Sequence, residues 1–362
     1  MKKVFNFSAG PSTLPDVVLK EAQTELINYK NTGISVMEMS HRSSVYEAVH
    51  QEVIDRFKDL MHIPESYEVL FIQGGASMQF AMIPMNFAND KKAYYVDAGI
   101  WGQKAYEEGK RVLKDNAVLL ASSKDIKYSN LPTLPEIPED AAYLHLTSNN
   151  TTEGTMMRTF PKTNVPIIVD MSSNILSVDY DISKIDMLYA GAQKNLGPAG
   201  VTVVIVKKSL LDTITHDNLP KMLDYRSYAA TNSMYNTPPT YSIYLMGLVL
   251  KWVDRLGGVK EMEKRATEKA NMLYNFLDTS KLFKATVTEN RSINNITFTT
   301  GDQDLDAKVL EQTTNDNLIN LKGHRLVGGL RASIYNAMEK EGVEVLIRTL
   351  QIFENKFGDK YV

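Results

Sequence analysis

The chain alternates short apolar runs with amphipathic stretches between residues 68 and 206. Each run is bounded by turn residues, as buried strands are, and the longer stretches between them repeat their apolar positions with a helical period. Strands that alternate with helices predict an α/β fold, with a mainly parallel sheet covered by helices on both faces. The expected strands are 68–73, 93–97, 117–121, 142–146, 166–170, 187–190 and 201–206, and the expected helices are 78–89 and 101–114.

The two ends of the chain have different patterns. Residues 1–15 contain Pro11 and Pro15, which oppose a helix, so we expect an irregular segment. Beyond residue 257 the regular alternation stops. We therefore expect an N-terminal segment (1–15), a large domain (16–257) and a smaller C-terminal α+β domain (258–362). The helices expected outside the alternating region are 16–31, 44–60, 241–255, 259–277, 305–312 and 343–357, and the strands are 284–288, 294–299 and 329–335.

Lys194 is the first candidate for chemistry. It lies in DMLYAGAQKNLGPAGVTVVIV, between two expected strands and in apolar surroundings. Lysine is almost never fully buried without a partner, and loss of water favours its neutral, nucleophilic form. Considered alone, a lysine whose amine reaches out to solvent is the more common explanation. Chemically useful groups elsewhere in the chain make a functional role for Lys194 the better explanation.

Several chemically useful groups follow expected strands, and the carboxyl ends of parallel strands meet at one edge of a sheet. The turn Gly74–Ser77 offers backbone N–H groups and a hydroxyl to a phosphate. Trp101 offers a flat face to an aromatic ring, and Asp170 ends a buried strand as a carboxylate that needs a cation or donors. Each has a structural alternative: a turn glycine, a core tryptophan, a helix cap. Together with Lys194 they fit pyridoxal phosphate, which has a phosphate, an aromatic ring, a ring nitrogen and an aldehyde that condenses with lysine.

Composition removes other classes of function. The chain has 40 basic and 43 acidic residues among 362, and a net charge of −3 gives no general attraction to nucleic acid or anionic lipid. There is no cysteine, so we expect neither disulfides nor a thiolate nucleophile, and we expect no metal site. The N-terminus lacks the apolar run of a signal peptide, and no stretch approaches the ~20 apolar residues of a membrane span. We expect a soluble, cytoplasmic protein.

Six segments together resemble one family along essentially the whole chain. The sequence is similar to the phosphoserine aminotransferases, which belong to the class V aminotransferases and to fold type I of the pyridoxal-phosphate-dependent transferases. The resemblance implies transfer of the amino group of L-glutamate to 3-phosphohydroxypyruvate, giving O-phospho-L-serine and 2-oxoglutarate in serine biosynthesis. The family also suggests formation of 4-phosphohydroxy-L-threonine in pyridoxine biosynthesis. The segments are FNFSAGPSTLP, SVMEMSHRSS, VDMSSNILS, YAGAQKNLGPAG, NTPPT and KGHRLVGGLRASIYNAM.

The resemblance also implies roles for individual residues. Lys194 would bind the cofactor covalently and move the proton of the substrate Cα, while Asp170 would pair with the ring nitrogen. Some members carry arginine where this chain has Ser77, so here the helix N-terminus and the hydroxyl would supply more of the phosphate binding. The cofactor residues implied within one chain are Ala76, Ser77, Trp101, Thr151 and Gln193. The partner subunit of a homodimer would add Asn236 and Thr237.

Both implied substrates are polyanions, so the site needs cations. Arg331 is the candidate for the α-carboxylate, because arginine suits bidentate contacts with carboxylate or phosphate. Two His-Arg pairs are candidates for the second anionic group, and their alternative is a solvated surface charge. The pairs are His41 with Arg42 and His324 with Arg325.

Three other functions could use a fold or cofactor of this kind. A cysteine desulfurase on the same fold is excluded, because it needs a cysteine nucleophile. An alanine–glyoxylate or serine–pyruvate aminotransferase of class V stays open, although it would need fewer cations. A cofactor-binding regulatory module would need an appended DNA-binding domain or a basic face, and the sequence contains neither.

Overall fold

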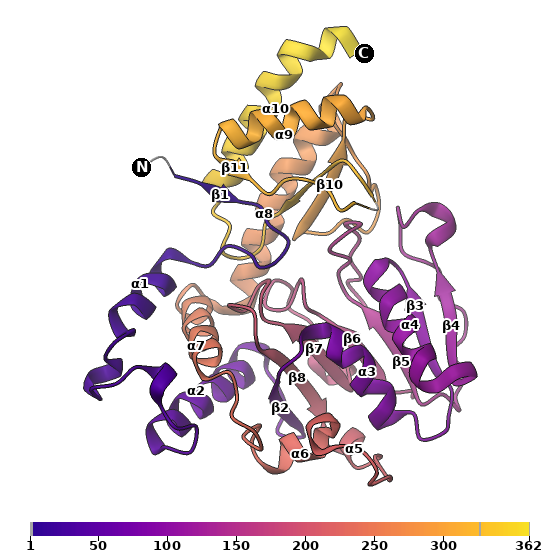
Figure 1. Cartoon of the computed structure of the whole chain (residues 1–362). Helices are drawn as coiled ribbons and strands as arrows, with labels where there is room; N and C mark the ends of the chain where they lie inside the picture. Colours follow the sequence, from indigo (N-terminus) through magenta and orange to yellow (C-terminus); the bar gives the residue numbers. More distant parts are fainter. Residues whose placement is uncertain (1–2, 326, 362) are drawn as a thin grey trace.

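The computed structural model describes residues 3–325 and 327–361. Figure 1 shows two lobes, of which one contains the large sheet and the other contains both chain ends. The helices are α1 (Asp16–Glu25), α2 (Ser44–Met61), α3 (Gly75–Phe87), α4 (Ile100–Leu113), α5 (Lys208–Leu211), α6 (Tyr225–Ala230), α7 (Thr240–Arg255), α8 (Gly258–Thr279), α9 (Gln303–Asn315) and α10 (Lys340–Tyr361). Among these residues, no helix is both long and apolar enough to span a bilayer.

The large lobe is built on a seven-stranded sheet with the order β2-β8-β7-β6-β5-β3-β4. Neighbours from β4 to β7 run parallel, while β8 is antiparallel to both β7 and β2. This confirms the predicted mainly parallel sheet. The strands are β2 (Tyr67–Ile72), β3 (Ala93–Asp97), β4 (Ala117–Ser122), β5 (Tyr143–Thr147), β6 (Ile167–Asp170), β7 (Met187–Gly191) and β8 (Thr202–Lys207).

Both faces of this sheet are buried, because alternate side chains of each strand enter different cores. Leu70 and Ile72 pack with α3 on one face. Val69 and Phe71 pack with α2 and α7 on the other. A strand without a solvent face has no reason to alternate with polar residues, which explains the continuous apolar runs of the sequence.

The second lobe has a three-stranded antiparallel sheet with the order β12-β10-β9. Its strands are β9 (Lys284–Ala285), β10 (Asn295–Thr299) and β12 (Leu330–Ser333), and α8, α9 and α10 pack with them. The start of the chain also belongs here, because β1 (Phe5–Asn6) pairs in parallel with β11 (Leu318–Ile319). The expectation of an irregular segment over residues 1–15 is therefore wrong at residues 5–6.

Two other expected elements differ from the structure. The helix expected over 16–31 ends at Glu25, and positive φ angles at Lys30 and Asn31 show that the chain has turned away from helical geometry there. The strand expected over 284–288 is only Lys284–Ala285. Both differences lie at element ends, where local turn geometry decides the boundary.

Helix α8 connects the two lobes physically, as Figure 1 shows. Its first turns contribute Val259 and Met262 to the core of the large lobe. Further along, Ala266 and Leu273 belong to the core of the small lobe. The division of the chain at residue 257 stays a prediction.

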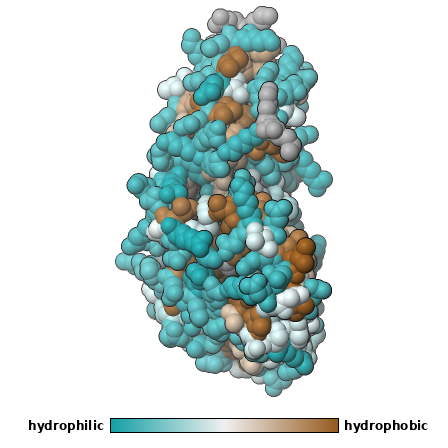
Figure 2. Space-filling view, turned by 90° about the vertical axis from the view of Figure 1, so that its left-hand side faces the viewer, coloured by the Kyte–Doolittle hydropathy of each residue, from teal (hydrophilic) through white to brown (hydrophobic). Residues whose placement is uncertain are grey.

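The side of the molecule that carries α1 and α2 exposes apolar side chains among polar ones (Figure 2). Isolated exposed apolar residues are ordinary, but a group of them on one stretch of chain is typical of an interaction surface. The exposed apolar residues of this stretch are Val17, Leu19, Leu26, Ile27, Ile34, Met37 and Val45.

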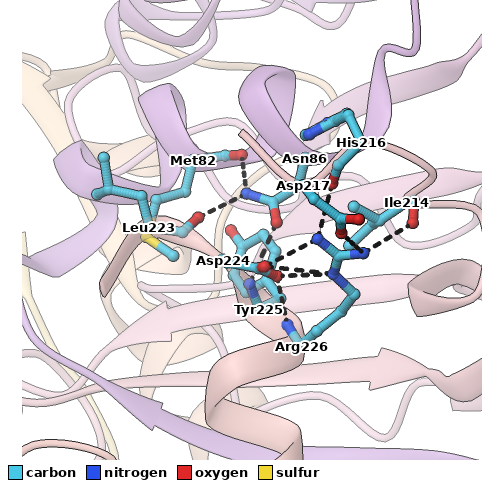
Figure 3. A network of polar contacts seen from close by, with 9 residues as sticks. All are labelled: Met82, Asn86, Ile214, His216, Asp217, Leu223, Asp224, Tyr225 and Arg226. Atoms are coloured by element: carbon cyan, nitrogen blue, oxygen red, sulfur yellow. Dashed lines mark hydrogen bonds and ion pairs between the residues drawn. The ribbon is translucent and has the colours of Figure 1, made fainter. Parts of the chain in front are cut away.

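A polar network fixes the C-terminal end of α3 (Figure 3). Asn86 donates to the carbonyl of Leu223 at 2.7 Å and accepts the N–H of Tyr225 at 3.1 Å. Arg226 pairs with Asp224 at 2.9 Å. These bonds attach the connection before α6 to α3, so the helix has a fixed position when its first turn meets the candidate site.

Lys269 ties α8 to the segment that follows β12. It is buried, and its amine donates to the carbonyls of Ile334, Tyr335 and Met338 at 3.2, 2.8 and 2.7 Å. Buried carbonyl oxygens need hydrogen-bond donors, and here a single amine donates to three of these oxygens.

We predict that Lys269→Met destabilises the protein, because it leaves these carbonyls without their shared donor at a cost of about 1–3 kcal/mol. The midpoint of thermal unfolding should fall by about 2 °C or more. Lys264→Met is the matched control, since Lys264 is an exposed residue of the same helix whose contact with Glu261 is a surface ion pair. Equal midpoints for the two variants would contradict the assignment.

Candidate active site at the carboxyl ends of the strands

A cavity of about 310 Å³ lies where the central strands end, and it brings together many of the residues expected to bind the cofactor. This matches the rule that ligands of open α/β sheets bind outside the carboxyl ends of the strands. The expected residues that line it are Ala76, Ser77, Trp101, Thr151, Asp170, Gln193, Lys194, His324 and Arg331.

Lys194 lies in the turn between β7 and β8 and points its amine into this cavity. The amine donates to the hydroxyl of Thr151 at 2.7 Å and lies 5.4 Å from the centre of the Trp101 ring. Burial lowers the pKa of Lys194 to about 8, although the nearby Asp170 carboxylate acts in the opposite direction. At pH 7 such a lysine is neutral in roughly one molecule in ten, far more often than an ordinary lysine, and the neutral form can act as a nucleophile or a base.

Asp170 is the last residue of β6 and is buried. Burial raises the pKa of its carboxyl group, while Lys194 and the N–H of Ser172 favour the charged form. That N–H donates to Oδ1 at 2.9 Å. A carboxylate held at the cavity wall is therefore ready to pair with a cationic group of a ligand.

The first turn of α3 forms another wall of the cavity. Gly74 and Gly75 have φ angles of +95° and +66°, and a Cβ on Gly74 would lie 2.5 Å from Cβ of Met78. Gly75, Ala76 and Ser77 line the cavity. The first N–H groups of a helix have no partner within the helix and favour anions, so this wall suits a phosphate.

Trp101 follows the N-terminus of α4 and faces Lys194 across the cavity. Its indole N–H is buried and has no hydrogen-bond partner among residues 3–325 and 327–361. Lys104, which the sequence did not single out, holds its amine 4.5 Å from the same ring.

Arg331 enters the cavity from β12 of the small lobe. One guanidinium nitrogen lies 3.5 Å from the carbonyl of Thr151, and Nε is buried without a partner in the described part of the chain. Burial lowers the pKa of Arg331. His324 also lines the cavity, and burial together with Arg331 and Lys104 lowers its pKa. An arginine with an unpaired donor beside further cations fits an anionic ligand.

The N-terminal segment is part of the site, which the sequence pattern did not indicate. Ala9 and Gly10 line the cavity, and the N–H of Ser12 donates to the carbonyl of Gln193 at 2.9 Å. The hydroxyl of Ser12 donates to the carbonyl of Lys194. Gly10 has a φ of +141°, and a Cβ there would lie 3.1 Å from Cγ of Lys194. Gly10, directly before Pro11, was the only local feature that could have indicated the role of this segment in the site.

Glu153 is a second residue that sequence reasoning missed. It is buried beside the cavity, and its Oε1 accepts the N–H of Ile100 at the start of α4 at 2.9 Å. Burial raises the pKa of Glu153 to about 7. Nothing in the run Thr151–Gly154 marks this side chain as buried, because glutamate is ordinarily exposed.

Five predicted residues do not line this cavity within one chain. Arg42 is exposed before α2, with His41 beside it. Asn236 and Thr237 are exposed, and the carbonyl of Thr237 accepts the side-chain N–H of Gln73 at 3.4 Å, next to the glycine turn. Arg325 is exposed beside His324. The roles given to these five stay predictions.

Comparison with known proteins identifies the family. The family model for class V aminotransferases matches residues 4–346. The chain belongs to the class V aminotransferases. It is 48% identical over 356 residues to the phosphoserine aminotransferase of Listeria monocytogenes serotype 4b, covering 98% of each chain. It is 49% identical over 361 residues to that of Streptococcus uberis, covering 98% of this chain and 99% of the relative.

Solved structures agree with this assignment. The phosphoserine aminotransferase from Bacillus circulans subsp. alkalophilus superimposes with a TM-score of 0.95 at 45% identity, covering 98% of this chain and 99% of that one. A pyridoxal-phosphate-bound phosphoserine aminotransferase from Trichomonas vaginalis gives 0.90 at 36% identity, covering 96% and 100%. This aminotransferase therefore has the fold type I architecture that the sequence predicted.

We predict that Gly10→Ala slows this aminotransferase by about tenfold or more, because the new methyl group presses on the side chain of Lys194. The matched control is Gly33→Ala. Gly33 also has a positive φ, of +84°, but a Cβ there meets nothing within 4 Å. Both variants carry backbone strain, so both should lose thermal stability.

Steady-state rates and unfolding midpoints separate the two effects. Only Gly10→Ala should lose turnover beyond its loss of stability. Full activity in a destabilised Gly10→Ala enzyme would show that the close approach to Lys194 is irrelevant to catalysis.

Proposed function

We propose that this aminotransferase transfers the amino group of L-glutamate to 3-phosphohydroxypyruvate, giving O-phospho-L-serine and 2-oxoglutarate, with pyridoxal phosphate as cofactor. The observation that supports it most directly is the meeting of Lys194, Asp170 and the unpaired Nε of Arg331 in one cavity. Curated relatives at 48–49% identity are phosphoserine aminotransferases.

The residues present fit pyridoxal phosphate. The first turn of α3 and the hydroxyl of Ser77 would hold its phosphate, and the Trp101 ring would stack on its ring. Asp170 would pair with the ring nitrogen, and Thr151 and Gln193 would contact the side of the ring that carries the hydroxyl. The phosphate of such a ligand would accept hydrogen bonds from the unpaired N–H groups of α3, and its ring nitrogen would bring a partner to the desolvated Asp170 carboxylate. When bound, the cofactor supplies an aldehyde for amines and a ring that accepts electrons.

The protein's own groups then carry out the acid–base work. Lys194, with a pKa of about 8, can take a proton from the substrate Cα and return it later. The hydroxyl of Thr151 fixes the position of its amine. Asp170 would offer its negative charge to the ring nitrogen and so favour the protonated form of that nitrogen.

Arg331 is the residue that would bind the α-carboxylate of both substrates through its guanidinium fork. The second anionic group would meet the cations near His324. Lys104 and Arg325 are among them, because the charge of each lowers the pKa of His324. Because His41 and Arg42 lie away from the cavity of their own chain, they would act across a subunit interface.

A homodimer with shared sites is part of the proposal. Asn236 and Thr237 are exposed, as residues that serve a neighbouring subunit must be in the isolated chain. The exposed apolar residues of the α1–α2 side offer surface for such contact (Figure 2). The second reaction, in pyridoxine biosynthesis, and the cytoplasmic location stay predictions.

The alternative within class V has weaker support. An alanine–glyoxylate aminotransferase from Nostoc sp. gives a TM-score of 0.73 at 17% identity, which shows a shared fold alone. The group of cations beside Arg331 also favours a substrate with two anionic groups over glyoxylate.

Substrate choice tests the proposal. Charge-assisted hydrogen bonds contribute about 1.5–3 kcal/mol each, so losing one should lower kcat/KM roughly ten- to a hundredfold. We expect Arg42→Ala and Arg325→Ala to damage the reaction with 3-phosphohydroxypyruvate far more than the reaction with unphosphorylated hydroxypyruvate. Arg331→Ala should damage both alike. Equal losses on the two keto acids for all three variants would reject phosphate recognition and favour the alternative.

Shared sites can be tested by mixing inactive variants. Lys194→Ala removes the reacting amine, and Asn236→Ala/Thr237→Ala removes the contribution to the neighbouring site. If sites are shared, a hybrid dimer regains one intact site, and activity should approach a quarter of wild type in a statistical mixture, about what random pairing gives. No recovery above the sum of the two parents would mean that each chain forms its own site.

A further inference from the structure

A buried polar pair lies behind Asp170, on the face of the sheet that α3 and α4 cover. Tyr189 on β7 and His145 on β5 are almost completely buried, and the Tyr189 hydroxyl lies 2.8 Å from Nε2 of His145. Tyr189 is also the residue directly opposite Asp170 in the register of β6 and β7, so both side chains project from the same face. Neither His145 nor Tyr189 lines the cavity.

The groups around His145 are aromatic. Its ring centre lies 6.4 Å from that of Phe80 on α3, 5.6 Å from that of Tyr95 on β3 and 6.0 Å from that of Tyr189. Burial lowers the pKa of His145 to about 3, so the ring is neutral at physiological pH. A neutral imidazole has one N–H and one acceptor nitrogen. Nδ1 has no partner within the described residues.

This unpaired nitrogen decides where the proton lies. If Nδ1 carried the imidazole proton, a buried N–H would have no acceptor. The Tyr189 hydroxyl would then have to donate its only proton to Nε2. If Nε2 carries it, Nε2 donates to the hydroxyl oxygen, and the hydroxyl proton is free for Asp170. Buried N–H groups without acceptors are rarer than buried acceptors without donors. The second arrangement is therefore the stable one.

We propose that His145 and Tyr189 are positioning residues, in which Nε2–H of His145 orients the Tyr189 hydroxyl so that it donates to Asp170 and keeps that carboxylate ionised. This rests on the proposed function, in which Asp170 meets the ring nitrogen of the cofactor. Burial raises the pKa of Asp170, and the nearby Tyr189 hydroxyl is among the groups that act in the opposite direction. The hydroxyl thus offsets part of the cost of burying a charge that the site requires.

The first test does not involve turnover. Nitrogen NMR of the cofactor-free protein with labelled histidine, assigned by the loss of one ring in His145→Gln, should show the Nε2–H tautomer between about pH 6 and 8. An Nδ1–H tautomer or a charged ring would overturn the proposal. This result does not depend on which substrate the enzyme uses.

The second test compares tyrosine variants in the holoenzyme. Tyr189→Phe should lower kcat about tenfold with little change in KM, because the reacting groups bind as before but Asp170 holds its charge less well. The pH midpoint of the visible cofactor band should rise, since less positive charge then remains beside the Lys194 nitrogen. Tyr143→Phe is the matched control: Tyr143 is buried in the same core, and its hydroxyl lies 2.5 Å from that of Tyr95.

Histidine variants complete the test. His145→Gln keeps an N–H donor near the position of Nε2 and should retain most of the activity, whereas His145→Leu should behave as Tyr189→Phe does. Equal losses in Tyr189→Phe and Tyr143→Phe with an unchanged midpoint would show a packing role and reject the proposal. A wild-type protein that forms no visible band with pyridoxal phosphate would reject the proposed function instead, and the tautomer measurement would still decide the arrangement of His145.

Discussion

The electrostatic attraction between two desolvated groups, the Lys194 amine and the Asp170 carboxylate, is the interaction on which the rest of the site depends. Burial disfavours the charged form of each group, and the charge of the other offsets part of that cost. Their proximity follows from the sheet: Asp170 ends β6, and Lys194 follows the adjacent strand β7. The register of two parallel strands therefore sets the distance between the amine and the carboxylate.

The neighbouring elements shield these two groups from water and hold them in position. The turn from β7 to β8 is too short for a helical crossover, so β8 returns antiparallel and holds Lys194 in a tight connection. Ser12 fastens the backbone of Gln193 and Lys194 from outside. Behind Asp170 the sheet face is aromatic, with His145 and Tyr189 as its polar members.

The sequence allowed the sheet and many of the residues that line the cavity to be predicted, because those residues sit at strand ends, where local pattern and position coincide. Asp170 and Lys194 are examples. Gly10, Glu153 and His145 could not be found in this way. Gly10 acts through contacts with residues far along the chain, Glu153 is a normally exposed type in a polar loop, and His145 lies within an apolar strand where a core role is the ordinary expectation. Long-range packing, which local patterns do not encode, determines all three.

The pairing of β1 with β11 has a consequence for how the protein is made. Phe5 lies beside Leu318, so β1 cannot pair until a segment far along the chain has been synthesised. The segment between β1 and α1 also covers the lysine and contributes Ala9 and Gly10 to the cavity wall. A chain that stops before β11 lacks the partner of β1, and with it the anchor of the segment that contacts Lys194. The wall of the candidate site is therefore anchored only after β11 has been synthesised.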